Sequence, residues 1–166
     1  QARSLAAEEA HDIIHAHDWL SFRAGMEAKR VSGKPLVVHV HATEFDRTGG
    51  HPNQYIYEEE RRGMHAADCI ISVSQHTKNV IMEHYGIEAD KITVVHNGID
   101  CADHRKALPP ALGHIKAEGK KIVLFVGRIT IQKGPDMFIK VAKRVLEYDP
   151  NVLFVVSGAG DMEHQI

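Results

Sequence analysis

The chain has few cysteines and no long apolar run, and both shortages limit what it can be. Its two cysteines, Cys69 and Cys101, do not have the spacing of a metal-binding motif. Cys69 opens an apolar run, which favours a buried reduced thiol and therefore a cytoplasmic protein. No apolar run approaches the roughly 18 residues that a membrane span needs. No signal-peptide pattern opens the sequence, so we expect neither export nor a membrane span.

Several catalytic and binding motifs are also absent. Gly158-Ala-Gly160 begins like a dinucleotide fingerprint, but Glu163 stands where the third glycine belongs. The sequence contains neither a P-loop nor the Gly-x-Ser-x-Gly of a hydrolase nucleophile. The formal net charge of -2 argues against a general nucleic-acid-binding protein, and we expect no nucleic-acid partner.

Apolar runs typical of strands alternate along the chain with patterns typical of helices. We expect strands at residues 12–17, 36–41, 69–73, 92–95, 122–126 and 152–156, and helices at 21–31, 53–67, 75–85 and 136–148. This alternation predicts an α/β fold with Rossmann-like parallel strands, flanked by helices that cover both faces. Residues 101–120, which include Pro109-Pro110, are expected to form a linker. The six strands could form one sheet or two partial sheets.

Polar residues cluster where the expected strands end. They are His15, His17 and Asp18 after the first strand, His41 after the second, then Ser74, Asn97, Gly127 with Arg128, and Gly158 with Gly160. Ligands of open parallel sheets bind beyond the carboxyl ends of the strands. The clustering therefore predicts one ligand site.

Two cations precede the helix that follows the fifth strand. Arg128 and Lys133 lie between that strand and Pro135, which suits the first position of a helix. The free N–H groups of a helix start attract anions. Two cations at such a start suit a diphosphate, although two solvated surface cations would give the same pattern.

Thirteen histidines are an unusual number, and four of them alternate along two expected strands. His15 and His17, and likewise His39 and His41, are spaced to share one face of a strand. A metal site, even that of a metal-dependent hydrolase, is one interpretation. We favour hydrogen-bonded histidines at a polar strand end, and we expect no metal.

Six segments, in this order, resemble those of retaining glycosyltransferases of the glycogen synthase-like group, which have the GT-B fold. The segments are His15-Ala-His-Asp-Trp19, Val38-His-Val-His-Ala-Thr-Glu44, Ile71-Ser-Val-Ser74, Val94-Val-His-Asn-Gly-Ile-Asp100, Phe125-Val-Gly-Arg128 with Gln132-Lys-Gly134, and Ser157-Gly-Ala-Gly-Asp161. The resemblance implies that residues 1–105 are the C-terminal part of an acceptor-side domain. Residues 106–166 would be the first β-α-β unit of a donor-binding domain.

The resemblance also implies roles for individual residues. His41 and Asp18 would be catalytic, with His17 nearby, and Asn97 would lie at the crossover between the domains. Gly127, Arg128 and Lys133 would hold the donor diphosphate, and Gly158 and Gly160 would let the nucleotide approach the backbone. The donor would be a UDP-, ADP- or GDP-sugar and the acceptor a carbohydrate or glycolipid, with no cofactor and no metal.

The resemblance stops short of two motifs of the group. The sequence contains neither the opening strand with its Gly-rich loop nor the later pair of spaced glutamates. We therefore expect a partial GT-B fold with open sheet edges, which invite a homodimer. The competing interpretation is a non-enzymatic module that at most binds a nucleotide.

Overall fold

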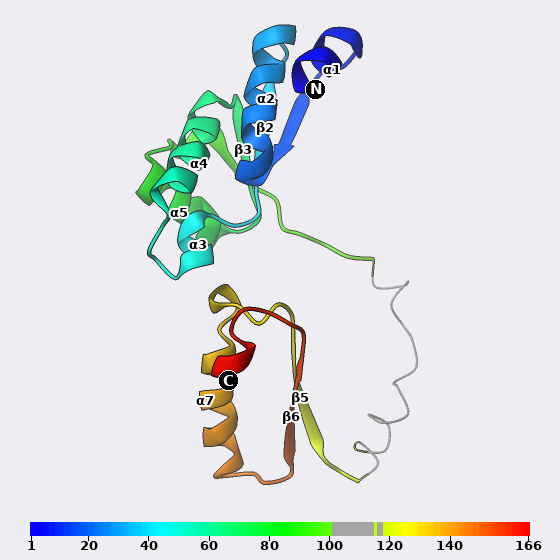
Figure 1. Cartoon of the computed structure of the whole chain (residues 1–166), viewed down its shortest axis with the longest axis vertical. Coiled ribbons are helices and arrows are strands. Elements are labelled where there is room, and N and C mark those ends of the chain that lie inside the picture. Colours follow the sequence, from blue (N-terminus) through cyan, green and yellow to red (C-terminus); the bar gives the residue numbers. More distant parts are fainter. Residues whose placement is uncertain (101–114, 116–117) are drawn as a thin grey trace. The chain divides into compact units, whose positions relative to one another are not determined.

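The computed structural model describes residues 1–100, 115 and 118–166, and the chain divides into two compact units, Gln1–Gly98 and Ile99–Ile166 (Figure 1). Most of the predicted linker at 101–120, Cys101 and the predicted domain boundary at residue 105 lie outside the described residues. Cys69 is a free thiol, as expected, and is partly buried.

The first unit is built on a four-stranded parallel sheet. Its strands β1 (Ile14–His17), β2 (Leu36–Val40), β3 (Cys69–Ser72) and β4 (Ile92–Val94) lie side by side in chain order. The connections contain α2 (Asp18–Ser32), α4 (Gln54–Ala66) and α5 (Gln75–Tyr85), as the sequence predicts, and the unpredicted α3 (Glu44–Thr48) and 3-10 turn η1 (Ala89–Lys91). An unpredicted helix, α1 (Ala2–Glu8), precedes β1 and is joined to α2 by the ion pair of Arg3 with Glu27.

The strand order determines which face of this sheet the helices cover. Right-handed crossovers between parallel strands that follow one another in one direction all fall on the same side. The burial of β2 agrees, because Leu36, Val38 and Val40 are at most 1% exposed while Val37 and His39, on the other face, are only partly buried. The predicted cover on both faces therefore holds, among the described residues of this unit, for one face only.

The core lies between the covered face of the sheet and helices α2, α4 and α5. It is made of residues from every one of these elements, among them Phe22, Leu36, Met64, Ile70, Ile81 and Tyr85. The ends of the helix predicted at 75–85 are confirmed: the Ser74 hydroxyl accepts the N–H of Thr77 at 3.0 Å at the start of α5, and Gly86 ends it with φ 67°. A left-handed residue at that position is best supplied by glycine.

The second unit contains a parallel pair of strands covered by one helix. Strands β5 (Lys121–Val126) and β6 (Val152–Ser157) pair with each other, and α7 (Pro135–Leu146) connects them, with the 3-10 turns η3 (Ile131–Lys133) and η4 (Glu163–Gln165) nearby. Phe138 of α7 packs against Phe125 and Phe154, with ring centroids 5.4 and 5.5 Å away. The side chains of Leu124 and Val126, in contrast, are 50% and 69% exposed.

Of the two arrangements left open by the sequence, the single six-stranded sheet is wrong. β1 to β4 form one sheet and β5 with β6 form another. The outer edges of β1 and β4 are paired with no described strand, so these edges of the sheet are open. A homodimer formed through them stays a prediction.

Gly63→Ala should destabilise the first unit, because α2 and α4 pack closely at this glycine. A Cβ at Gly63 would lie 2.4 Å from Cδ2 of Phe22, a side chain that is 1% exposed. Overpacking of this kind costs about 1–3 kcal/mol, which outweighs the better helix propensity of alanine. Urea unfolding measures the change, and Arg61→Ala, exposed on the same helix, is the control. If the two variants were equally stable, the helix packing described here would be wrong.

Candidate functional site

The carboxyl ends of β1 and β2 bring Asp18 and His41 together. The two strands are parallel and in register, with His17 opposite His39, so the residues that follow them leave the sheet at the same edge. Oδ1 of Asp18 accepts the backbone N–H of His41 at 2.8 Å. The predicted proximity of these two residues is therefore confirmed, and His41 is exposed rather than part of the core.

Asp18 has an unusual backbone conformation. With φ 54° it is the one non-glycine residue at positive φ among those that the structure describes. This region costs an ordinary residue about 1–2 kcal/mol, although aspartate tolerates it better than most. Such outliers concentrate at functional sites when the surrounding structure fixes them. Here the turn into α2 is fixed by Ser21, whose hydroxyl donates to the carbonyl of His17 at 2.6 Å.

A buried carboxylate anchors the loop that follows His41. Oε1 of Glu60 accepts a hydrogen bond from Arg47 at 2.7 Å, and Oε2 accepts the N–H of Glu44 at 3.0 Å and the hydroxyl of Tyr85. Arg47 also donates to the carbonyl of Ala42 at 2.6 Å. Burial raises the pKa of Glu60, and the hydrogen bonds from Tyr85, Arg47 and Glu44 oppose that rise. No local sequence pattern points to this network, because its members come from three different elements.

Four histidines form a stack on the face of the sheet that the described helices leave open. His15 and His17 come from β1, His39 from β2 and His41 from the residue after it, and neighbouring rings have centroids 4.3 to 5.4 Å apart. Nδ1 of His17 and Nε2 of His41 are 3.0 Å apart and share a hydrogen bond. This pair fits the expected hydrogen-bonded strand end.

His39 does not fit that expectation. Both of its ring nitrogens are shielded from solvent and have no hydrogen-bond partner among the described residues. Burial, assisted by the neighbouring histidines, lowers the pKa of His39 and of His15, so both rings are neutral near pH 7. One ring nitrogen from each of His15, His17 and His39 lies within 4.8 Å of the others, which makes this trio the group of described residues able to hold a metal ion.

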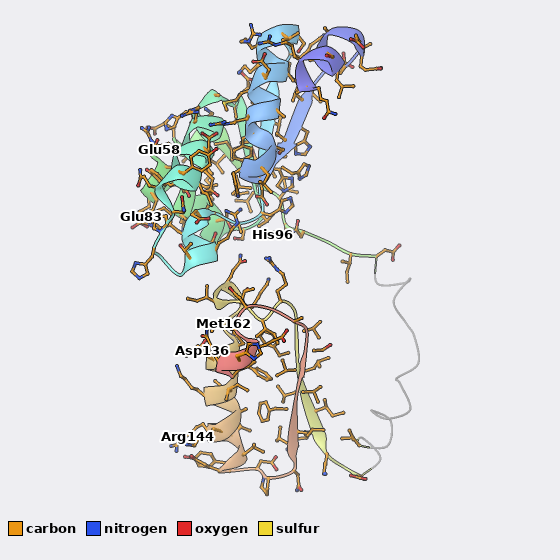
Figure 2. The ribbon with its side chains drawn as sticks, viewed as in Figure 1. Glu58, Glu83, His96, Asp136, Arg144 and Met162 are labelled. Atoms are coloured by element: carbon orange, nitrogen blue, oxygen red, sulfur yellow. The ribbon has the colours of Figure 1, made fainter. Side chains whose placement is uncertain are left out.

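The other predicted residues of the first unit lie apart from this stack or have structural roles. Ser74 caps α5. His96, labelled in Figure 2, shares a hydrogen bond with the carbonyl of Val73 at 3.2 Å, and Asn97 beside it is exposed. The structure does not bring Asn97 into contact with Asp18 or His41 through any hydrogen bond.

In the second unit, the loops that follow β5 and β6 are tied to each other. The N–H of Ile129 donates to the carbonyl of Ala159 at 2.9 Å, and the N–H of Met162 donates to the carbonyl of Ile129 at 3.0 Å. A Cβ at Gly158 would lie 1.8 Å from the carbonyl oxygen of Gly127, and one at Gly160 would lie 2.2 Å from that of Ile129. The two glycines are thus needed for the contact between the loops, before any role toward a nucleotide.

Arg128 and Lys133 lie in the first of these loops. Both side chains are exposed, and neither forms a hydrogen bond or ion pair with a described residue. The helix after them starts as the sequence predicts, with Gly134 at φ 64° and proline at the first position.

The start of α7 also carries an acidic group. Asp136, labelled in Figure 2 at the same end of the unit as Met162, pairs with Lys140 at 3.1 Å, and this hydrogen bond lowers the pKa of its carboxyl. Arg128 and Lys133, rather than the helix start alone, are therefore the groups free to attract an anion there.

The candidate residues thus form two groups, each at the carboxyl edge of its own sheet. His17, Asp18 and His41 are together in the first unit. Gly127, Arg128, Lys133, Gly158 and Gly160 belong to the paired loops of the second. No described helix combines the length and the apolar composition needed to cross a membrane.

Known protein families match both units. The family Glycosyltransferase Family 4 matches residues 1–103, and Glycosyl transferases group 1 matches residues 113–166. The chain is 30% identical over 168 residues to an uncharacterized glycosyltransferase of Methanocaldococcus jannaschii, covering 93% of this chain and 42% of that protein. It is 34% identical over 166 residues to the alpha-maltose-1-phosphate synthase of Mycolicibacterium smegmatis, covering 92% and 42%. The chain therefore spans less than half the length of these relatives.

Solved structures support the fold. The crystal structure of the Anabaena protein HepE in complex with UDP and glucose superposes with a TM-score of 0.74 at 21% identity, over 98% of this chain and 43% of that one. The parallel sheets flanked by helices are thus a partial GT-B fold, as the sequence predicts.

Asp18→Ala should destabilise the first unit, because it removes the acceptor of the His41 N–H and places alanine at positive φ. Alanine at positive φ costs about 1–2 kcal/mol, and the exposed N–H of His41 also loses a charged acceptor. Asp18→Asn keeps both the oxygen and the tolerance of positive φ, so most of the stability should remain. Urea unfolding of both variants measures the difference, and equal losses would show that the hydrogen bond to His41 is unimportant.

Proposed function

Because the chain belongs to Glycosyltransferase Family 4, we propose that it takes part in transferring a sugar from a nucleotide-sugar donor to an acceptor, with retention at the anomeric carbon. The observation that carries this proposal is the pair of exposed cations, Arg128 and Lys133, at the carboxyl edge of β5 without partners among the described residues. The UDP and glucose in the HepE complex support a UDP-sugar as the donor.

The chemistry gives the two cations their role. Transfer from a nucleotide sugar breaks the bond between the anomeric carbon and a diphosphate oxygen, so negative charge grows on the leaving diphosphate. Arg128 and Lys133 would neutralise that charge in place, and the metal-independent reaction predicted from the sequence needs such groups. Losing one preorganised donor of this kind typically costs about 3 kcal/mol of barrier.

On the acceptor side, the exposed ring of His41 would contact the transferring sugar. Its ring is oriented by His17 at 3.0 Å and its backbone by Asp18 at 2.8 Å. An imidazole held in this way can hydrogen-bond a sugar hydroxyl without forming a covalent intermediate. Retention would then come from attack on the same face within an ion pair. A relative named alpha-maltose-1-phosphate synthase supports a carbohydrate acceptor of the glucan type.

A second candidate is nucleotide binding without transfer. The loops after β5 and β6 are joined by backbone hydrogen bonds inside the second unit, so the residues proposed to bind the diphosphate all belong to this one unit. Incubating the chain with UDP-glucose and an oligosaccharide acceptor separates the candidates. Product formation supports transfer, while binding of UDP without product supports the narrower function.

Replacing both Arg128 and Lys133 by alanine should abolish UDP binding and leave the fold intact, because both side chains are exposed. A hydrogen bond to a charged group contributes about 1.5–3 kcal/mol, so each substitution should weaken binding by roughly 10-fold to 100-fold. Isothermal titration calorimetry in EDTA measures the affinity, and parallel titrations with ADP and GDP identify the preferred base.

Lys143→Ala is the matched control for that double variant. Lys143 is also an exposed cation without a described partner, but it lies in the last turn of α7. Its removal should leave the UDP affinity unchanged. If the double variant bound UDP as tightly as this control, the assignment of the diphosphate site would be overturned.

A further inference from the structure

The stack of histidines on the open face of the first sheet is not used by the proposed transfer, except for His41 and its partner His17. One ring nitrogen from each of His15, His17 and His39 lies within 4.8 Å of the corresponding atoms of the other two. The pairing of strands β1 and β2 explains why these three histidines lie together. His15 and His17 alternate on one strand, and His39 is the parallel partner of His17 on the next.

We propose that His15, His17 and His39 bind a divalent transition-metal ion of the zinc class. Imidazole nitrogen is a preferred ligand of such ions, and three histidines with an open fourth position form a recognised coordination set. With metal–nitrogen bonds of about 2.0–2.1 Å, tetrahedral ligands lie roughly 3.4 Å apart. Because an imidazole binds a metal in the plane of its ring and the rings of His15 and His39 are stacked, binding requires side-chain rotations that turn the three nitrogens toward one ion.

The state of His39 is an independent observation that points to a ligand. Its two ring nitrogens are shielded from solvent and make no hydrogen bond to any described residue. Polar atoms in such positions normally have a partner, and each exception needs a physical reason. A metal ion bound to one nitrogen supplies that partner directly.

His41 acts on this site as a positioning residue. Its Nε2 lies 3.0 Å from Nδ1 of His17, which leaves Nε2 of His17 free to bind the ion. Metal-bound histidines usually hydrogen-bond through the second ring nitrogen, and that outer partner fixes the ring and tunes affinity. A metal ion would fix the orientation of the His17 ring, and the hydrogen bond between the two rings would then also fix the orientation of His41. The ion thus has a structural role at the acceptor side and takes no part in binding the diphosphate.

The test uses the whole chain without an affinity tag and titrates it with ZnCl2 in a buffer that does not bind metals. We expect one zinc ion per chain, a zinc-dependent rise of the unfolding temperature, and visible absorption bands from bound Co²⁺ that report its coordination. His15→Asn and His39→Asn should each weaken zinc binding by about tenfold or more, since even outer partners contribute that much. His41→Ala should weaken it by about 10-fold to 100-fold while the Co²⁺ bands keep their shape.

His51→Ala is the control, because His51 is exposed and makes no hydrogen bond to a described residue. It should bind zinc as the unchanged chain does. Failure of the chain to bind zinc, or equal affinity in His15→Asn, His39→Asn and His51→Ala, would overturn the proposal. UDP affinity measured in EDTA should be the same in His15→Asn, His39→Asn and His51→Ala, so the metal site and the diphosphate site can fail separately.

Discussion

Parallel pairing of β1 with β2 is the constraint on which the rest of the first unit depends. With His17 opposite His39, both strands leave the sheet at the same edge, and the residues that follow them must share it. Asp18 and His41 then lie close enough for a 2.8 Å hydrogen bond. The same register directs four histidines onto one face, while the crossovers place the helices and the apolar core on the other.

Buried polar contacts hold the loops at the carboxyl edge of the first sheet in place. Glu60 is 1% exposed, and its carboxylate is compensated by Arg47, Tyr85 and the N–H of Glu44. Removing one partner from such a network would leave an uncompensated buried group, which is far more costly than the network is stabilising. In the second unit, glycines rather than buried polar groups hold the loops together. Gly158 and Gly160 let the two loops contact each other where any side chain would collide with a backbone oxygen.

Much of the fold could be predicted from the sequence, because its strands and longer helices carry strong local patterns. Both ends of α5 agree with the predicted range 75–85, because the residues that cap it, Ser74 and Gly86, act through local conformation. The short helix α3 was not predicted, although the sequence contains the two residues of its capping box, Thr43 and Asp46. The sequence predicted helices on both faces of the sheet because residues such as Val37 and Cys69, on the open face, are apolar. Apolar residues alone do not show whether helices of this chain pack against them.

The site was predictable where sheet geometry alone determines it, as for Asp18 with His41, and not where distant elements contribute. The Glu60 network joins α3, α4 and α5, and the unpaired state of His39 depends on its neighbours in three dimensions. The sequence contains Asp136 but does not show that it pairs with Lys140. This carboxylate at the start of α7 makes the helix start itself less favourable for binding an anion.

The central claim is that the carboxyl edge of the β5–β6 pair, with its two free cations, is where the donor diphosphate binds. Amide hydrogen exchange of the whole chain, measured with and without UDP, tests it most directly. The account predicts slower exchange in residues 127–134 and 157–163 and unchanged exchange in the last turn of α7. Protection confined to the first unit, or the absence of any change at a saturating concentration of UDP, would contradict it.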